Sequence, residues 1–214
     1  MPTQAERSET TRARLIRAAR GRFIAQGYQA TLLDSILRDA GLSKGALYHH
    51  FESKEAVFAA VFEEVAMEAV AQARAAERAG DTPLTVLIQV SMAWLEAVTT
   101  SPARVIILET APLVMGWQKT RQIQERTAIG LVRANLRAAI AAGEAHCADV
   151  HTAARLIGVT LSELALLRHE AARNAPNLAK LHVLVRNLIL HLSGAELHEV
   201  RAHLPAGAAA SPSA

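Results

Sequence analysis

The sequence predicts an all-α protein, built from a small N-terminal helical domain and a larger C-terminal helical domain. Hydrophobic residues make up 51% of the 214 residues but aromatic residues only 4%, which reflects heavy use of Ala and Leu. These two residues favour helices, although a high Ala content also follows from genome base composition. Apolar side chains recur at helical spacing in successive segments, and no segment requires a β-strand or repeats another.

The first helix is expected over residues 10–26, because Leu15, Ile16, Ala19 and Phe23 fall on one face at helical spacing. The residues before it are polar, and we expect them to be disordered. A Gly-Tyr pair at positions 27 and 28 closes the helix.

Residues 31–51, TLLDSILRDAGLSKGALYHHF, predict two short helices joined by a tight turn. Thr31 is expected to cap the first of them, with Asp34 three positions on as in a capping box. Gly41 takes the position where a helix ends in a left-handed residue, and Ser43 caps the second helix. A helix, a glycine turn and a second helix form a helix-turn-helix, whose second helix lies in the DNA major groove.

The second helix, residues 44–50, divides into an inner and an outer face. Leu47 and Phe51 point toward the first helix, whereas the outward set comprises Lys44, Gly45, Tyr48 and His49. Gly45 costs about 1 kcal/mol of helix propensity relative to Ala, and one use for it is a close approach of backbone to a phosphate or base. The helix N-terminus at Ser43 also offers free N–H groups to a phosphate.

The charge distribution favours the same interpretation. Residues 1–55 hold nine Lys and Arg against six Asp and Glu, whereas the remainder holds fourteen of each, so the net charge of +3 lies entirely on the first segment. A basic surplus on one module is expected of a phosphate-binding protein. The alternative is an ordinary solvated surface, so the positive charge indicates nucleic-acid binding only in combination with the helix-turn-helix motif.

Further motifs flank the helix-turn-helix on both sides. They comprise Gly27, Thr31, the Ala40-Gly41-Leu42-Ser43 turn, Gly45, the Leu47-Tyr48-x-His50-Phe51 core and Ser53-Lys54-Glu55. With these motifs, residues 9–69 resemble the DNA-binding domain of the tetracycline-repressor (TetR) family of bacterial transcription regulators. One departure is Ser35-Ile36-Leu37, where the family more often has an Ile-Ala pair, and Leu37 makes that packing tighter.

The resemblance implies roles for individual side chains around the motif, residues 32–51. Base edges would be contacted by Lys44, Gly45 and His49, and phosphates by Thr31, Ser43, Tyr48 and Lys54. The partner would be a double-stranded palindromic operator, whose half-sites lie about 34–36 Å apart when a two-fold dimer reads it.

The rest of the chain predicts a second helical domain over residues 70–200. A long helix capped by Ser53 is expected to run to about residue 79 and to enter this domain. Residues 201–214 are rich in Pro, Ala, Gly and Ser, so we expect a disordered tail. Further helices are expected over residues 83–100, 101–112, 117–142, 150–173 and 176–197.

The last two helices are apolar over most of their circumference, as LIGVTLSELALL and LAKLHVLVRNLIL show. A helix that is hydrophobic on most sides is buried on most sides, and a second copy of the chain would supply the cover. The family resemblance implies the same homodimer, joined by a four-helix interface. The residues expected there are Leu161, Leu164, Leu184, Leu188 and His191.

Polar or soft side chains stand among aliphatic ones in the middle of the second domain. They comprise Met92, Trp94, Glu109, Trp117, Thr160 and Glu163. Proteins similar to this one hold a small-molecule effector between these helices, in an apolar pocket with a few polar groups. The alternative places Trp94 and Trp117 in the core and Glu163 at the dimer seam.

Other classes of protein are not favoured. The cluster of His146, Cys147 and His151 matches no zinc-ligand spacing, so we expect no metal and no cofactor. No phosphate loop, nucleophile elbow or acid pair indicates an enzyme. Charged or amide residues interrupt every apolar run, so no membrane span is expected, and the single cysteine and absent signal peptide indicate a cytoplasmic protein.

The sequence therefore predicts a ligand-responsive DNA-binding regulator, acting as a homodimeric repressor that a small-molecule effector releases from its operator. Two alternatives stay open. An activator of the same fold would share every residue, and a helical ligand-binding or adaptor protein would keep the fold without using DNA.

Overall fold

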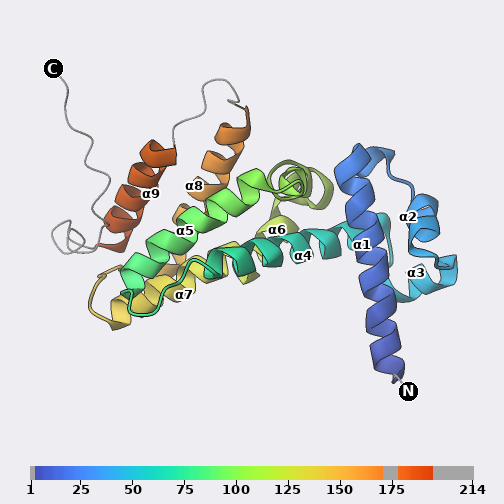
Figure 1. Cartoon of the computed structure of the whole chain (residues 1–214), viewed down its shortest axis with the longest axis horizontal. Coiled ribbons are helices and arrows are strands. Elements are labelled where there is room, and N and C mark those ends of the chain that lie inside the picture. The colour runs from blue at the N-terminus through green and yellow to red at the C-terminus, as the bar shows by residue number, and fades with distance from the viewer. Residues whose placement is uncertain (1–2, 171–177, 195–214) are drawn as a thin grey trace.

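The computed structural model describes residues 3–170 and 178–194, which form helices and connecting loops without strands. Figure 1 shows α1 to α3 gathered at one end and α5 to α9 at the other, with α4 running between them. The predicted all-α class and its two-part organisation are confirmed. The expected tail, residues 201–214, lies outside the described residues.

The N-terminal domain holds α1 (Gln4–Ala30), α2 (Leu33–Ala40) and α3 (Lys44–His50). The expected start of the first helix at residue 10 is wrong, because α1 begins at Gln4. Thr3 and Glu6 form a capping box there, in which the Thr3 hydroxyl accepts from the Glu6 N–H and the Glu6 carboxylate accepts from the Thr3 N–H. Gly27 interrupts α1 with a φ of 78°, so the chain turns before the helix ends.

The turn between α2 and α3 has the predicted geometry. Gly41 is left-handed, with φ 62° and ψ 42°, and the Ser43 hydroxyl accepts a hydrogen bond from the Ala46 N–H at 3.2 Å. The Arg14 guanidinium of α1 donates to the Ala40 carbonyl at 2.6 Å, which satisfies an acceptor at the end of α2. The helix-turn-helix is therefore fixed by local capping and by one contact from the preceding helix.

The expected cap of α2 is wrong. Thr31 is the C-cap of α1, and the N-cap of α2 is Leu32, whose side chain makes no capping hydrogen bond. Asp34 lies in the first turn of α2, where its negative charge is favourable toward the helix dipole. Arg22 of α1 and Asp39 of α2 form a two-bond ion pair at 2.6 and 2.8 Å, which lowers the pKa of Asp39.

Aromatic packing joins this domain to α4 (Lys54–Arg74). The Phe58 ring lies 5.3 Å from both the Phe23 and the Tyr28 ring in edge-to-face geometry. Leu47 of α3 is fully buried in the same core. Because α3 has only seven residues, it depends on this packing and not on its own helical propensity.

The larger domain departs from the expected helix boundaries. It holds α5 (Pro83–Thr100), the π-helical turn η1 (Ile106–Thr110), α6 (Ala111–Arg126), α7 (Ala128–Ala141), α8 (Val150–Glu170) and α9 (Leu178–Ser193). The single helix expected over residues 117–142 is two helices, because Thr127 is non-helical with φ −113° and ψ −108°. α6 is itself interrupted by Gly116, with φ 75° and ψ 161°.

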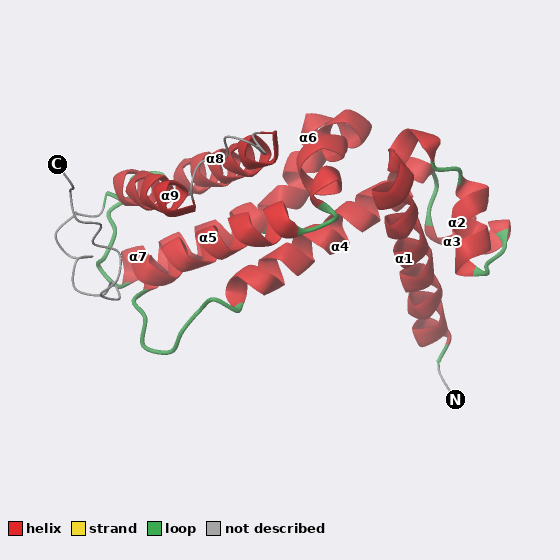
Figure 2. Cartoon of the chain, turned by 45° about the horizontal axis from the view of Figure 1, so that its top comes forward, coloured by secondary structure: helices red, strands yellow, loops and turns green. Residues whose placement is uncertain are grey.

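Within residues 3–170 and 178–194, two helices are long and apolar enough to cross a membrane by length and composition alone. They are residues 83–100 of α5 and residues 150–168 of α8, so the charged or amide residues that interrupt these segments do not by themselves exclude a span. α5 packs against α4, α7, α8 and α9, as Figure 2 also shows. A helix covered on several sides by protein carries the same apolar composition as a membrane span, so these two segments are weak evidence for one.

The left-handed turn predicts opposite effects for two glycine substitutions. Gly41→Ala should destabilise the fold by about 1–2 kcal/mol, because a Cβ is strained at a φ of 62°. Gly21→Ala should stabilise it by about 0.5–1 kcal/mol, because Gly21 lies inside α1 and an added Cβ would have nothing within 4 Å. Urea denaturation followed by circular dichroism measures both; equal effects of the same sign would contradict the assigned turn.

Candidate functional site

The outer surface of α3 is open to solvent. Ser43, Lys44, Gly45, Tyr48 and His49 are all exposed, and 53% of the Tyr48 surface is accessible although its ring is large and apolar. Leu47, between them in sequence, is completely buried. α3 therefore presents a phenol, an imidazole, an ammonium group and a bare backbone on one face, as a helix that reads nucleic acid requires.

Two features leave this face free to bind. The Lys44 ammonium lies 3.7 Å from the Asp34 carboxylate, with both side chains about two-thirds exposed at 66% and 71%. An exposed pair at this separation is weak, so a phosphate or base edge can replace the carboxylate. At Gly45, the nearest atom to an added Cβ is the Ser43 hydroxyl oxygen at 3.9 Å, so the outer side of the helix is open.

The expected phosphate contact of Thr31 is not supported by the structure. The residue has 0% exposure, and its hydroxyl donates to the Gly27 carbonyl at 2.7 Å and accepts from the Gln26 amide at 3.3 Å. Both capacities of the hydroxyl are thus used inside the domain. Thr31 holds the end of α1 together and does not face outward.

Lys54 is likewise directed inward, contrary to its expected phosphate contact. Its ammonium donates to the carbonyls of Tyr28 at 2.7 Å, Thr31 at 2.8 Å and Gln29 at 3.5 Å, and lies 4.2 Å from the centre of the Tyr28 ring. Burial lowers the pKa of this ammonium. Lys54 thus satisfies the carbonyls at the C-terminus of α1, where a positive charge is favourable.

A groove beside α3 contains residues that the sequence analysis did not assign. It has a volume of about 550 Å³ and lies between the N-terminal turns of α1 and the length of α3. Its lining residues are Gln4, Ala5, Arg7, Ser8, Thr11, Gly45, Ala46, His49 and His50. The N-terminal turns of α1 therefore lie next to the exposed face of α3. The Thr3-Gln4-Ala5-Glu6 sequence, a capping-box pattern, is the signal that could have predicted this earlier helix start.

The larger domain contains a cavity of about 230 Å³ that is lined by residues of α4, α5, η1, α6, α7 and α8. Trp94, Trp117 and Glu163 line it, as three of the expected ligand residues. Met92, Glu109 and Thr160 do not line it: Met92 packs against the core, Glu109 is exposed, and the Thr160 hydroxyl donates to its own helix at Leu156. The alternative that Trp117 is a core residue is wrong, since 72% of its surface is exposed.

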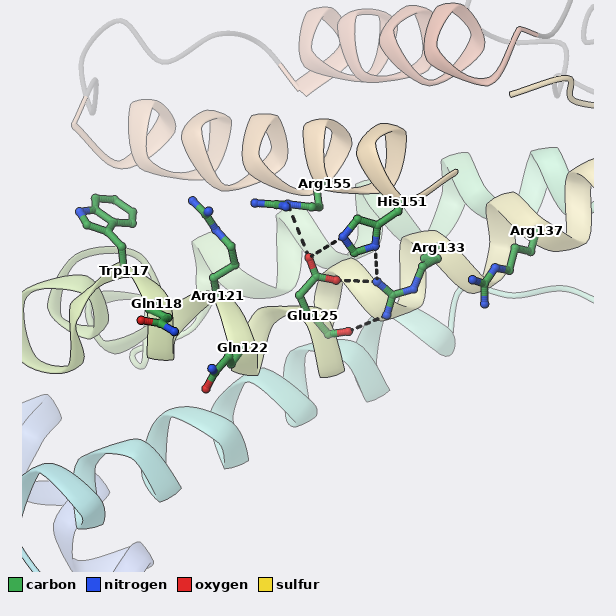
Figure 3. Close-up of a pocket in the computed structure, with 9 residues that line it drawn as sticks. All are labelled: Trp117, Gln118, Arg121, Gln122, Glu125, Arg133, Arg137, His151 and Arg155. Atoms are coloured by element: carbon green, nitrogen blue, oxygen red, sulfur yellow. Dashed lines mark hydrogen bonds and ion pairs between the residues drawn. The ribbon is translucent and has the colours of Figure 1, made fainter. Parts of the chain in front are cut away.

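The cavity opens into a wider groove, shown in Figure 3, with a volume of about 890 Å³. Trp117, Arg121 and Arg155 line both spaces, and Gln118, Gln122, Glu125, Arg133, Arg137 and His151 line the groove. Sequence reasoning did not find the arginines, because α6, α7 and α8 bring them together from distant positions. In residues 3–170 and 178–194, no group of three or more His, Cys, Asp or Glu is arranged to hold a metal ion.

Ion pairs connect the wall of this cavity to α4. Lys119 of α6 lies 2.5 Å from Glu55, in the first turn of α4, and Arg126 lies 2.9 Å from Glu63. Trp117 and Arg121, which line the cavity, lie on the same helix as Lys119 and Arg126. One helix therefore contacts both the cavity and the helix that carries the N-terminal domain.

An exposed apolar surface covers α8 and α9. Its large members are Leu156, Val159, Leu167, Val183 and Leu184, with exposed fractions from 44% to 57%. Of the expected interface residues, Leu184 and His191 are exposed, and Leu164 and Leu188 are partly buried. Leu161 is only 2% exposed and packs in the core of its own chain, so its placement on the interface is wrong.

Comparison with known proteins assigns the family. Residues 15–61 match the bacterial regulatory proteins of the tetR family, and residues 84–192 match the domain described as tetracyclin repressor-like, C-terminal. The chain belongs to the TetR family. The resemblance seen over residues 9–69 thus extends through the larger domain.

Individual relatives agree with this assignment. The TetC protein of transposon Tn10 from Escherichia coli is 26% identical over 133 residues, which cover 61% of this chain and 66% of that protein. The HTH-type transcriptional regulator SrpR of Pseudomonas putida is 47% identical over 57 residues, 27% of each chain. These matches span less than two thirds of the curated relatives. A TetR-family transcriptional regulator of known structure from Pectobacterium atrosepticum is 30% identical, with a TM-score of 0.67 over 87% of this chain and 97% of that one.

The inward position of Lys54 predicts that its removal affects folding more than salt-dependent binding. Lys54→Met should lower the free energy of unfolding by about 1–3 kcal/mol, because partly buried carbonyls lose a charged donor. The exposed Lys44→Met should change it by less than about 0.5 kcal/mol. Urea denaturation measures both. A stable Lys54 variant whose DNA affinity has a salt slope reduced by about one unit would instead make Lys54 a phosphate contact.

Proposed function

We propose that this TetR-family protein is a homodimeric transcriptional repressor that a small-molecule effector releases from a palindromic operator. The observation that carries the proposal is the exposed face of α3, with Lys44, Gly45, Tyr48 and His49 held outward by a buried Leu47. The match of the chain to a family of transcription regulators supports the binding of DNA by this face. A regulator of this kind acts in the cytoplasm and performs no catalysis.

On DNA, Lys44, Gly45 and His49 contact base edges, whereas Ser43 and Tyr48 contact phosphates. The Ser43 end of α3 adds backbone N–H groups to the phosphate contact. Arg7 and Ser8, which line the groove beside α3, are placed to follow the adjacent backbone. Thr31 and Lys54 support this surface from inside the domain.

Dimerisation covers the apolar surface on α8 and α9. Exposed Leu, Val and His side chains on two adjacent helices support a four-helix interface, with Leu184, Leu188 and His191 at its centre and Leu164 at its edge. A two-fold dimer then presents its α3 helices to successive major grooves, about 34–36 Å apart.

The effector binds in the cavity beside α6, where Trp94, Trp117 and Glu163 lie. Residues 117–126 of α6 lie between two non-helical positions, Gly116 and Thr127, so this segment is able to move as one piece. Its ion pairs to Glu55 and Glu63 transmit such a movement to α4, and the α3 helices of the dimer change their separation. An effector shifts this equilibrium only by the difference between its affinities for the two dimer geometries.

A gel shift against the DNA upstream of the protein's own gene tests the proposal. Binding of that fragment, with at least roughly a hundredfold preference over random DNA of equal length, supports it. Absence of any specific shift would favour the adaptor alternative. Transcription from the same fragment distinguishes a repressor from an activator. Removal of the protein raises expression if it is a repressor and lowers expression if it is an activator.

One substitution on α3 tests whether its exposed face binds DNA. Lys44→Ala should weaken operator binding by about 1–3 kcal/mol, because a charged contact to a base edge or phosphate is lost. Arg78→Gln, an exposed cation beyond the far end of α4, is the matched control and should leave the affinity unchanged. Fluorescence anisotropy over a range of salt concentrations measures both; equal losses would place the contact surface elsewhere.

A second substitution tests the dimer. Leu184 is 57% exposed in the single chain and would be covered in the dimer. Leu184→Glu should therefore shift the protein to monomers, because the dimer would bury a charge at this position. Leu113→Glu, on α6 and 87% exposed, is the control and should remain dimeric. Sedimentation equilibrium measures the mass, and a dimeric Leu184 variant would move the interface off α9.

A further inference from the structure

We propose that the effector is an amphipathic organic carboxylate, whose apolar body fills the cavity and whose carboxylate binds Arg121 and Arg155 at its mouth. The proposal rests on the effector function given to this cavity above. It adds the chemical class of the ligand and two residues that recognise it.

The walls of the cavity favour an apolar body. Trp94, 5% exposed, and the buried Phe62, Ile107 and Ile129 contribute much of its lining. Trp117 stands at the mouth with 72% of its surface exposed, which leaves a large aromatic face accessible to a ligand. A volume of about 230 Å³ is smaller than that of pockets for drug-sized ligands, so the body is small.

The mouth of the cavity favours an anion. Among the described residues that line the cavity, Arg121 and Arg155 carry the positive charge, and both also line the outer groove, where Arg133 and Arg137 follow. Figure 3 shows Arg121 extending from α6 toward α8, on the side from which Arg155 projects. A guanidinium donates two parallel hydrogen bonds to a carboxylate, so two guanidinium groups at one opening form a specific site for it.

The acidic residue in the groove, Glu125, pairs with Arg155 but not with Arg121. Glu125 is shared among Arg133 at 2.5 Å, Arg155 at 3.6 Å and His151 at 3.9 Å, as the dashed lines in Figure 3 show. Arg155 makes this contact through its Nε. In the part of the chain that the structure describes, Arg121 has no ion pair or hydrogen bond, so its charge is available to a ligand.

Glu163 sets the orientation of the ligand. It lies eight positions after Arg155 on α8, which is about 12 Å along a helix, so it lines a part of the cavity away from Arg155. A carboxylate at the Arg121 end lies away from it, and a hydroxyl at the far end of the ligand is able to donate to it. A cationic ligand would gain one partner in Glu163 but would face two guanidinium groups, so an anion is favoured.

The test uses matched pairs of small molecules that differ only in charge. Benzoate, 2-naphthoate and decanoate are compared with benzamide, 2-naphthamide and decanamide on the full-length protein. Trp94 and Trp117 are the only two tryptophans in the chain, and both line the cavity, so their fluorescence reports occupancy directly. At least one acid should bind, roughly tenfold or more tightly than its amide, as expected for a hydrogen bond to a charged group.

Two variants separate a specific carboxylate site from general attraction by a basic groove. Arg121→Gln should abolish the preference for acid over amide and leave the affinity for the amide within about twofold. Arg137→Gln removes an equal charge from the same groove but from a residue that does not line the cavity, and should retain the preference. Circular dichroism confirms that both variants fold.

Three results would overturn the proposal: no acid binds, the amides bind as well as the acids, or the preference survives Arg121→Gln. Operator affinity, measured with and without the best acid, keeps this outcome distinct from that of the proposed function. A protein that binds DNA but no acid retains its function and loses this ligand class. A protein that binds acid through Arg121 without any change in operator affinity retains the ligand class and loses the effector mechanism.

Discussion

The structure depends on α4, which belongs to the cores of both domains. Phe58 and Phe62 on this helix have 0% exposure. Phe58 packs on Phe23 and Tyr28 of α1, whereas Phe62 lines the cavity of the larger domain. Removing a buried Phe side chain of this kind costs about 3–5 kcal/mol, so α4 cannot leave either core without loss of much of a domain's stability. The two domains are therefore linked by a packed rod and not by a flexible connection.

The ion pairs between α6 and α4 act differently from this packing. Each involves exposed side chains, and exposed pairs contribute about 0–1 kcal/mol, so Lys119–Glu55 and Arg126–Glu63 do not hold the domains together. They bias the position of α4 by amounts that ligand binding can overcome. A regulator that switches between two arrangements needs strong contacts inside each domain and weak contacts between the parts that move.

Local signals predicted the helix-turn-helix, and long-range contacts explain where the predictions failed. Gly41 and Ser43 are recognised from the sequence because a left-handed cap and a hydroxyl cap act within a few residues. Lys54 could not be placed in this way, since its partners Tyr28 and Thr31 lie 26 and 23 residues earlier and a motif does not reveal which way an ammonium points. Thr31 failed for a related reason: a Thr beside two helices can cap either one.

The larger domain was less predictable because its signals are not local. α8 is apolar around most of its circumference, so periodicity could not tell Leu161, which faces the core, from its exposed neighbours. The cavity was harder still. Arg121 and Arg155 are far apart in the chain and stand in stretches that resemble ordinary solvated helix faces, and only the packing of α7 against both α6 and α8 brings them to one opening.

The arrangement of α6 explains why a charged ligand would be felt at the DNA-binding end. The segment from Trp117 to Arg126 has the cavity mouth on one side and its pairs with α4 on the other. Gly116 and Thr127 have non-helical backbone angles, so the segment is separated from its neighbours by a break in helical geometry at each end. A carboxylate drawn between Arg121 and Arg155 would pull this short segment toward α8. Lys119, on the same segment, would then move relative to Glu55, in the turn of α4 that follows the helix-turn-helix. The charge of the proposed ligand, and not only its bulk, would then change the position of α3.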